Sequence, residues 1–227
     1  MIIDLHTHSF PKSDDSFLSP EDLIGEAKRV GLDGICLTDH DGFWNPQEIA
    51  ALSKKFNFPL FPGCEVTTEE GHLLVFGLEK YIFGMHRATF VRGLVDEVGG
   101  AIVVAHPYRR RFMETQAADI TSYTAMIEQA CESQVFSMVD SVEVLNGRGS
   151  TSENAFSAEI AKRFDLRATG SSDAHNIKDI GTFATAFERD IPDLKTLIKE
   201  LREGSYQPLA LEKRRAPTVT EGQLQNI

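Results

Sequence analysis

The sequence is poor in cysteine. It has only three in 227 residues, Cys36, Cys64 and Cys131, and no two of them form a C-x-x-C pair. An odd number of widely spaced thiols is typical neither of a disulfide framework nor of a zinc finger. We therefore expect a protein of a reducing compartment, with the cytoplasm as the simplest location.

Long apolar runs are also lacking. No stretch of about 18 apolar residues is present, so the sequence predicts no transmembrane helix. The first residues contain no basic region followed by an apolar stretch and a cleavage site, and we expect no secretory leader. The length suits one domain with a large core. We expect this single domain at residues 1–210 and a polar C-terminal tail at 211–227.

The sequence has fewer basic than acidic residues. The 23 lysines and arginines face 34 acidic residues, which leaves a formal net charge of −11. This balance argues against an extensive basic surface for nucleic acid. A small phosphorylated substrate is compatible with it if bound metal ions reverse the local field. The expected partner is therefore a small phosphate ester, without membrane or extensive nucleic-acid contact.

Histidines are present in a distinctive pattern. His6 and His8 directly follow the apolar run at residues 1–3. Side chains two positions apart on a strand point to the same face, so both imidazoles can reach one point. Imidazole is a ligand for zinc, iron and similar ions. The sequence thus predicts a metal ligand pair at the end of the first strand.

The same arrangement recurs along the chain. Apolar runs are followed at once by His, Asp or Glu at 38–41, 63–65, 71–72, 105–107 and 172–175. Six of the seven histidines fall at these places or in the first pair, and only His86 does not. Donors that recur in this way favour one shared site over six unrelated histidines.

Strands and helices are expected to alternate along nearly the whole chain. Apolar runs predict strands at 1–5, 34–37, 59–61, 73–76, 101–105, 141–145, 166–170 and 184–187. Helical spacing and capping residues predict helices at 20–30, 46–52, 90–98, 123–131, 156–164 and 194–201. Such alternation indicates βα units and a parallel sheet, with sites at the carboxyl ends of the strands. A closed α/β barrel fits best, because only a ring brings first, middle and last strands together.

The motifs also resemble those of a known family. DLHTHS, TDHD, GCEVTT, GHLLVFG, AHP and SSDAH occur in this order between about Ile2 and Gly181. Together they are similar to the motifs of the polymerase-and-histidinol-phosphatase (PHP) family of metal-dependent phosphoesterases. The resemblance implies a distorted (β/α)7 TIM-like barrel with a trinuclear metal site at the carboxyl ends of its strands.

The resemblance also implies a set of ligands. The first metal would take His6, His8, Glu65 and Asp173. The second would share Glu65 and take His72 and His106, and the third would take Asp15, His40 and His175. The adjacent Asp14 is an alternative to Asp15, because the loop length leaves the choice open.

The donor types support metal-dependent phosphoester chemistry independently of the family. Nitrogen and oxygen donors without thiolate suit two to three divalent ions of zinc, manganese or iron. Ions about 3.5–4 Å apart can hold a phosphate between them and activate a bridging water. We therefore expect a hydrolase acting on a small phosphomonoester, a nucleotide or an oligonucleotide end, by attack of a metal-bridging hydroxide on phosphorus.

Further residues are candidates for roles in the reaction. We expect Glu65 to act in catalysis as the bridging carboxylate. Asp39 is a proton donor or a neighbour of the ligands in one interpretation and a turn or capping residue in the other. Arg109 and Arg148 follow strand ends. In one interpretation they bind phosphate, since guanidinium matches its geometry, and in the other they belong to solvated basic loops.

Two other functions remain open. Metal-loaded barrels with a His-x-His strand end also hydrolyse carbon–nitrogen bonds. PHP domains attached to polymerases can be non-catalytic modules, which often lack ligands. Asp173, His175 and the extra strand-end carboxylates suggest three metals, which favours phosphoester over carbon–nitrogen chemistry. The complete candidate set of ligands favours catalysis over a structural module.

Overall fold

The computed structural model describes residues 1–211. The tail expected at 211–227 lies, apart from Leu211, outside the described residues. None of the helices in the described part combines the length and the apolar character that crossing a bilayer requires.

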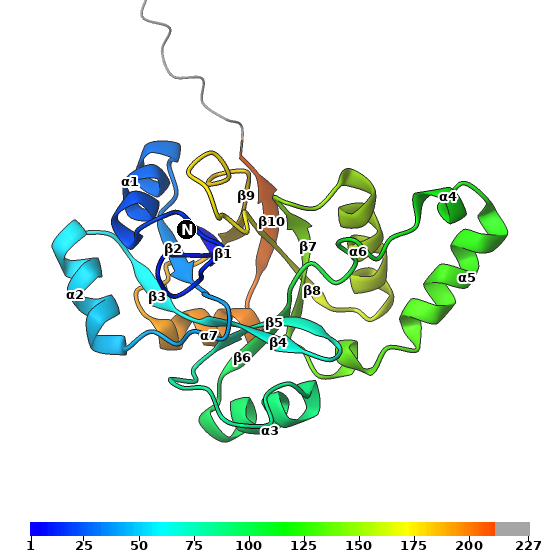
Figure 1. Ribbon diagram of the computed structural model, residues 1–227, viewed down its shortest axis with the longest axis horizontal. Coiled ribbons are helices and arrows are strands. Elements are labelled where there is room, and N and C mark those ends of the chain that lie inside the picture. The colour runs from blue at the N-terminus through cyan, green and yellow to red at the C-terminus, as the bar shows by residue number, and fades with distance from the viewer. Residues whose placement is uncertain (212–227) are drawn as a thin grey trace, which may run out of the picture.

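The strands form two five-stranded sheets. The first has the order β10-β9-β1-β2-β3, made of β1 (Ile2–Thr7), β2 (Gly34–Leu37), β3 (Leu60–Pro62), β9 (Phe183–Phe187) and β10 (Tyr206–Ala210). The second has the order β4-β5-β6-β7-β8, made of β4 (Cys64–Thr68), β5 (Gly71–Phe76), β6 (Ala101–Val104), β7 (Ser141–Asn146) and β8 (Arg167–Ser171). Figure 1 shows the strands in the middle of the molecule and helices around them.

Five of the helices in the described part begin at a residue whose side chain caps the first turn. They are α1 (Pro20–Val30), α2 (Pro46–Phe56), α3 (Ala88–Val98), α4 (Glu114–Ala117), α5 (Ile120–Cys131), α6 (Thr151–Arg163) and α7 (Leu194–Glu203), with a 3-10 turn, η1 (Gln134–Ser137). Ser19 with Asp22, and Ser150 with Glu153, form capping boxes at α1 and α6. The six expected helices are all present, and the short α4 is additional.

The strand directions differ from the expected parallel ring. β1, β2 and β3 pair in parallel, as do β6, β7 and β8. In contrast, β5 is antiparallel to β4 and β6, and β9 is antiparallel to β1 and β10. Only two residues separate β4 from β5, a connection that permits a hairpin but not a crossover. The α/β class is therefore observed, whereas the closed (β/α)7 barrel is not confirmed, because the hydrogen-bonded strands of the described residues fall into two separate sheets.

Contacts outside the two ladders also join the sheets. Single parallel bridges connect Thr7 with Ala174 and His40 with Glu65. The Thr185 hydroxyl of β9 donates to the Gly170 carbonyl of β8 at 2.9 Å and accepts from its amide at 3.1 Å. The bridge between His40 and Glu65 thus brings parts of both sheets together where predicted ligands lie.

The strand β6 shows how the core is built. All of its residues are buried, as the continuous apolar run predicted. Ile102 and Val104 belong to the apolar cluster that contains Val91 of α3, and Val103 belongs to the cluster that contains Leu197 of α7. Because β6 is fixed from both faces, the residues that follow it are held in one position.

Candidate metal centre

Six of the seven histidines lie at one site, and five of them surround one carboxylate. Glu65 is fully buried near the start of β4. Its Oε2 lies 3.2 Å from His6 Nε2, 3.2 Å from His8 Nε2 and 2.9 Å from His40 Nδ1. The seventh, His86, is exposed before α3, as expected for a residue outside the site.

The other oxygen of Glu65 faces a second pair of imidazoles. Its Oε1 lies 2.7 Å from His72 Nδ1 and 3.0 Å from His106 Nε2. His72 stands at the start of β5 and His106 follows β6. Because β5 runs antiparallel to β6, these ends are neighbours, and the Ala105 amide donates to the His72 carbonyl at 3.0 Å. A carboxylate with donors on both oxygens is suited to bridging two cations.

Asp173 supplies a second buried carboxylate. Its Oδ1 lies 3.3 Å from His8 Nε2 and 3.7 Å from His6 Nε2, and its Oδ2 lies 3.7 Å from His106 Nε2. Asp173 and His106 both have positive φ, 53° and 28°. Such backbone is uncommon outside glycine and collects at functional sites.

Asp15 completes a third group. Its Oδ2 lies 2.9 Å from His175 Nε2 and 3.5 Å from His40 Nε2. Of the two adjacent acids, Asp15 is the one within ion-pair distance of these imidazoles in the described part of the chain. The structure thus brings together every residue that the sequence analysis assigned as a metal ligand.

The donor atoms fit metal ions. Buried atoms without a hydrogen-bond partner include His6 Nε2, His8 Nε2, Glu65 Oε2, Asp173 Oδ1 and His175 Nε2. Burying a polar atom without a hydrogen-bond partner costs free energy of folding. Here several such atoms lie close together, as the ligands of a shared ion would. Groups whose donor atoms lie within 4.8 Å of one another are His6–His8–Glu65, His40–Glu65–His72, His6–His106–Asp173 and His8–His40–His175. All are nitrogen and oxygen donors, which suit zinc, manganese or iron.

The field at this site favours positive charge. Burial raises the pKa of Glu65, but the surrounding imidazoles, His6 foremost, outweigh it and hold that pKa well below its usual value. Burial opposes the charged form of His6, yet Glu65, Asp173 and Glu143 raise its pKa well above the usual value. Cations placed between these acids would be stabilised by the same field.

Glu143 is a buried residue that the sequence analysis missed. Its Oε1 lies 3.0 Å from His6 Nδ1, and its Oε2 accepts from the His106 amide and from Asn146 Nδ2, both at 2.9 Å. Asn146 also donates to Asp173 Oδ2 at 3.1 Å. Carboxylates that orient ligand histidines in this way tune metal sites. A glutamate inside the apolar run at 141–145 was the available signal.

Asp39 lies beside the site rather than inside it. Its carboxylate accepts from the Ser9 amide at 2.5 Å, the Ser9 hydroxyl at 2.9 Å and Trp44 Nε1 at 2.7 Å. These contacts hold the loop after β1 against the loop after β2. They favour the interpretation of Asp39 as a loop-fixing residue, and its role in proton transfer stays a prediction.

The two predicted phosphate-binding arginines point at the site. Arg109 donates to Asp173 Oδ2. The Arg148 guanidinium lies 2.7 Å from His175 Nδ1 and 3.9 Å from Asp173 Oδ1. Arg110 and Arg111, by comparison, are exposed. Of these four arginines, Arg109 and Arg148 are therefore the two that contact predicted ligands.

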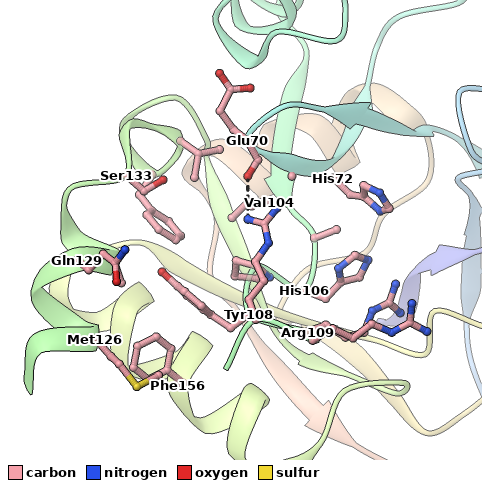
Figure 2. Close-up of a pocket in the computed structure, with 18 of the residues that line it drawn as sticks. Glu70, His72, Val104, His106, Tyr108, Arg109, Met126, Gln129, Ser133 and Phe156 are labelled. Carbon is pink, nitrogen blue, oxygen red and sulfur yellow. Dashed lines mark hydrogen bonds between the residues drawn. The ribbon is translucent and has the colours of Figure 1, made fainter. Parts of the chain in front are cut away.

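A cleft opens beside these residues. It has a volume of about 490 Å³ and is lined by His72, His106 and Arg109 at the metal centre and by Tyr108 and Phe156 farther away. Figure 2 shows the two imidazoles and Arg109 at one end and Met126, Gln129 and Ser133 at the other. The metal centre is thus accessible from a cavity of ligand size.

Related proteins share parts of the sequence. An error-prone DNA polymerase of Nocardia farcinica is 39% identical over 64 residues, which are 28% of this chain and 6% of the polymerase. An uncharacterised protein of Methanocaldococcus jannaschii is 28% identical over 121 residues, which are 48% of this chain and 68% of that protein. The chain thus matches only a small part of the polymerase.

Solved structures share the fold. A two-domain protein of Bacteroides vulgatus, containing a predicted PHP-like metal-dependent phosphoesterase, has a TM-score of 0.61 at 20% identity, covering 93% of this chain and 65% of that one. An amidohydrolase of Chromobacterium violaceum with bound sulfate and no metal has a TM-score of 0.57 at 19% identity, covering 92% of this chain and 98% of that one.

Family models match two regions that contain most of the candidate ligands, with His106 lying between them. Residues 4–92 match the PHP domain, and residues 151–206 match the PHP-associated region. The first match contains Glu65 and the histidines at 6, 8, 40 and 72, and the second contains Asp173 and His175. With these two matches and the converging ligands, the chain belongs to the PHP family.

Proposed function

We propose that the protein is a metal-dependent phosphoesterase that hydrolyses a small phosphomonoester, a nucleotide or an oligonucleotide end. The observation that carries the proposal is the arrangement at Glu65, whose two oxygens face five imidazoles. Asp173 and two arginines lie directly beside it. Acids and imidazoles can hold several cations, and guanidinium groups add affinity for phosphate.

Three groups of residues would hold two to three ions of zinc, manganese or iron. They are His6, His8, Glu65 and Asp173, then Glu65, His72 and His106, and then Asp15, His40 and His175. Divalent ions at these positions would neutralise phosphate charge and lower the pKa of bound water. His6 is fixed for this task by Glu143, and His8 by Ser13 Oγ at 3.1 Å from its Nδ1.

The arginines would orient the phosphate. Arg109, which follows β6, contacts Asp173, and Arg148, which follows β7, contacts His175. Two guanidinium groups at one place bind non-bridging phosphate oxygens and oppose charge that develops in the transition state. Positioning of this kind, together with Glu65, supports phosphoester hydrolysis over chemistry that needs a protein nucleophile.

The proposed partner is a small molecule. The formal net charge of −11 supports a substrate without an extensive nucleic-acid contact surface. The cleft beside His72 and His106 is of a size that suits a small organic group.

Phosphate release by metal-reloaded protein tests the proposal. The full chain is stripped with a chelator, reloaded with Mn²⁺ or Zn²⁺ and assayed with sugar phosphates, mononucleotides and a short oligonucleotide. We expect release that requires metal and is lost in His8→Ala. Ammonia release from an amide panel without phosphate release would instead indicate carbon–nitrogen hydrolysis. If metal-loaded protein released neither phosphate nor ammonia, a non-catalytic module would be indicated.

A further inference from the structure

The far end of the cleft has the partly exposed ring of Tyr108 as its aromatic floor, with Phe136 and Phe156 buried behind it. Tyr108 packs edge-on against Phe156, with ring centroids 4.5 Å apart, and lies 6.4 Å from Phe136 in a stacked orientation. Met126 of α5 and Val104 of β6 add aliphatic surface. Rings and thioethers of this kind contact flat apolar groups well.

The rim of the cleft is positively charged in an otherwise acidic protein. Arg109, Arg110 and Arg111 all line it, whereas Glu70 is the one carboxylate among its lining residues in the described part of the chain. The exposed Arg111 guanidinium donates to the Glu70 carbonyl at 3.4 Å, and both residues line the cleft. A second anion on a bound molecule would be attracted here, and an ammonium group would be repelled.

The cleft is continuous with the candidate metal centre. His72 and His106 line it and also face Glu65, and Arg109 both lines it and contacts Asp173. A phosphate held at the metal centre would therefore place its ester group toward Tyr108 and Phe156 (Figure 2).

We infer that this cleft is the leaving-group subsite, and that it selects phosphate esters whose organic part is a flat apolar ring bearing a second negative charge. The inference rests on the proposed phosphoesterase function. Esters of aliphatic alcohols without a ring, and esters that carry an ammonium group, are disfavoured because they leave the aromatic floor uncovered or meet the arginine rim.

Phosphonates that cannot be hydrolysed test the subsite separately from turnover. Binding of methylphosphonate, 4-carboxybenzylphosphonate and 4-(aminomethyl)benzylphosphonate to the metal-loaded full chain is measured by calorimetry. We expect the carboxylate to bind about tenfold more tightly than the ammonium compound, and both the ring and its charge to contribute. Equal binding of all three, or no binding of any, overturns the inference.

Two variants assign the effect to the cleft. Arg111→Met should lower the preference for carboxylate over ammonium about threefold, while Lys54→Met, which removes an equal charge from exposed α2, should leave it unchanged. Ser133, whose side chain makes no capping bond at η1, can be replaced by Trp to fill the far end. Ser133→Trp should weaken both ring compounds about tenfold and spare methylphosphonate. An Arg111→Met protein with the wild-type preference would contradict the inference.

Hydrolysis of the matching aryl phosphates distinguishes the two proposals. Turnover of methyl phosphate and of all aryl esters at similar kcat/KM would support the phosphoesterase and overturn the subsite. Selective phosphonate binding without hydrolysis of any ester would support the subsite and contradict the phosphoesterase.

Discussion

Glu143 holds two parts of the candidate metal centre in place from one position. Its carboxylate contacts His6 Nδ1 and the amide of His106, which belong to different sheets. It is fully buried, and Asn146 connects it to Asp173. A positioning residue of this kind acts on metal affinity through the orientation of the ligands.

Replacing Glu143 should weaken the metal centre without unfolding the protein. Glu143→Gln keeps the shape and one acceptor but removes the charge that favours the bound orientation of His6. We expect metal affinity to fall about 10–100-fold in competition with a chromogenic chelator. Glu159→Gln, on the outer face of α6, is the matched control and should retain wild-type affinity. Equal affinities in the two variants would exclude the positioning role.

The convergence of the candidate ligands could be predicted from sequence, whereas the residues that orient them could not. His6, His8 and Asp173 directly follow or end apolar runs, a pattern that is readable along the chain. Glu143 lies inside such a run, and its partner His6 is 137 positions away. Only the folded strands bring the two residues together, so the local sequence gave no indication of the role of Glu143.

The start of α6 connects helix capping to the basic loop. Glu153 accepts from the Ser150 amide at 2.7 Å and also from the amide of Arg110. Burial raises the pKa of Glu153, but these hydrogen bonds outweigh it and hold the pKa below its usual value of 4.5. Ionised Glu153 therefore stabilises the fold at neutral pH.

The contribution of Glu153 should depend on pH in a defined direction. Because its folded-state pKa is lowered, the stabilisation is complete above about pH 4.5 and is lost as the pH falls through the folded-state pKa. We expect Glu153→Gln to unfold in urea with about 1 kcal/mol less stability at pH 7, and with a smaller difference at pH 3. A difference that is constant over this range would show that the charge is not involved.

The turn after β7 brings backbone against the strand end that carries Asp173. A Cβ built on Gly147 would lie 2.4 Å from the Ser172 carbonyl oxygen. Gly147→Ala should therefore displace this strand end and cost about 1–3 kcal/mol in urea unfolding, with weaker metal binding. Gly93→Ala in α3, where nothing lies within 4 Å, should instead add about 0.5–1 kcal/mol. Similar stabilities for the two variants would contradict the close approach.

At the scale of the whole molecule, the candidate ligands are divided between the sheets. His6 and His8 come from β1 or its end, and Glu65, His72 and Asp173 come from the second sheet or its ends. The alternation of strands and helices predicted the α/β class. It could not predict the two separate sheets, because a short apolar run such as 73–76 carries no information on strand direction.

Metal binding should therefore stabilise the pair of sheets. Ligands that bind only the folded state raise stability by about 2.7 kcal/mol at 100 times their Kd, which corresponds to about 5–10 °C in Tm for a chain of this size. We expect this rise when Mn²⁺ or Zn²⁺ is added to stripped protein in a thermal shift assay. Glu65→Gln should show little of it, and an equal shift in the variant would place the metal elsewhere.

A titration of activity against bound metal tests directly whether the candidate metal centre hydrolyses phosphate esters. Stripped full chain receives increasing Mn²⁺ or Zn²⁺, bound metal is counted by mass spectrometry, and phosphate release is measured on the ester panel at each step. We expect phosphate release to be absent without metal and to rise with metal occupancy up to two to three ions per chain. It should be missing in Glu65→Gln. Release that is independent of metal, or none from a fully loaded protein, would contradict this expectation.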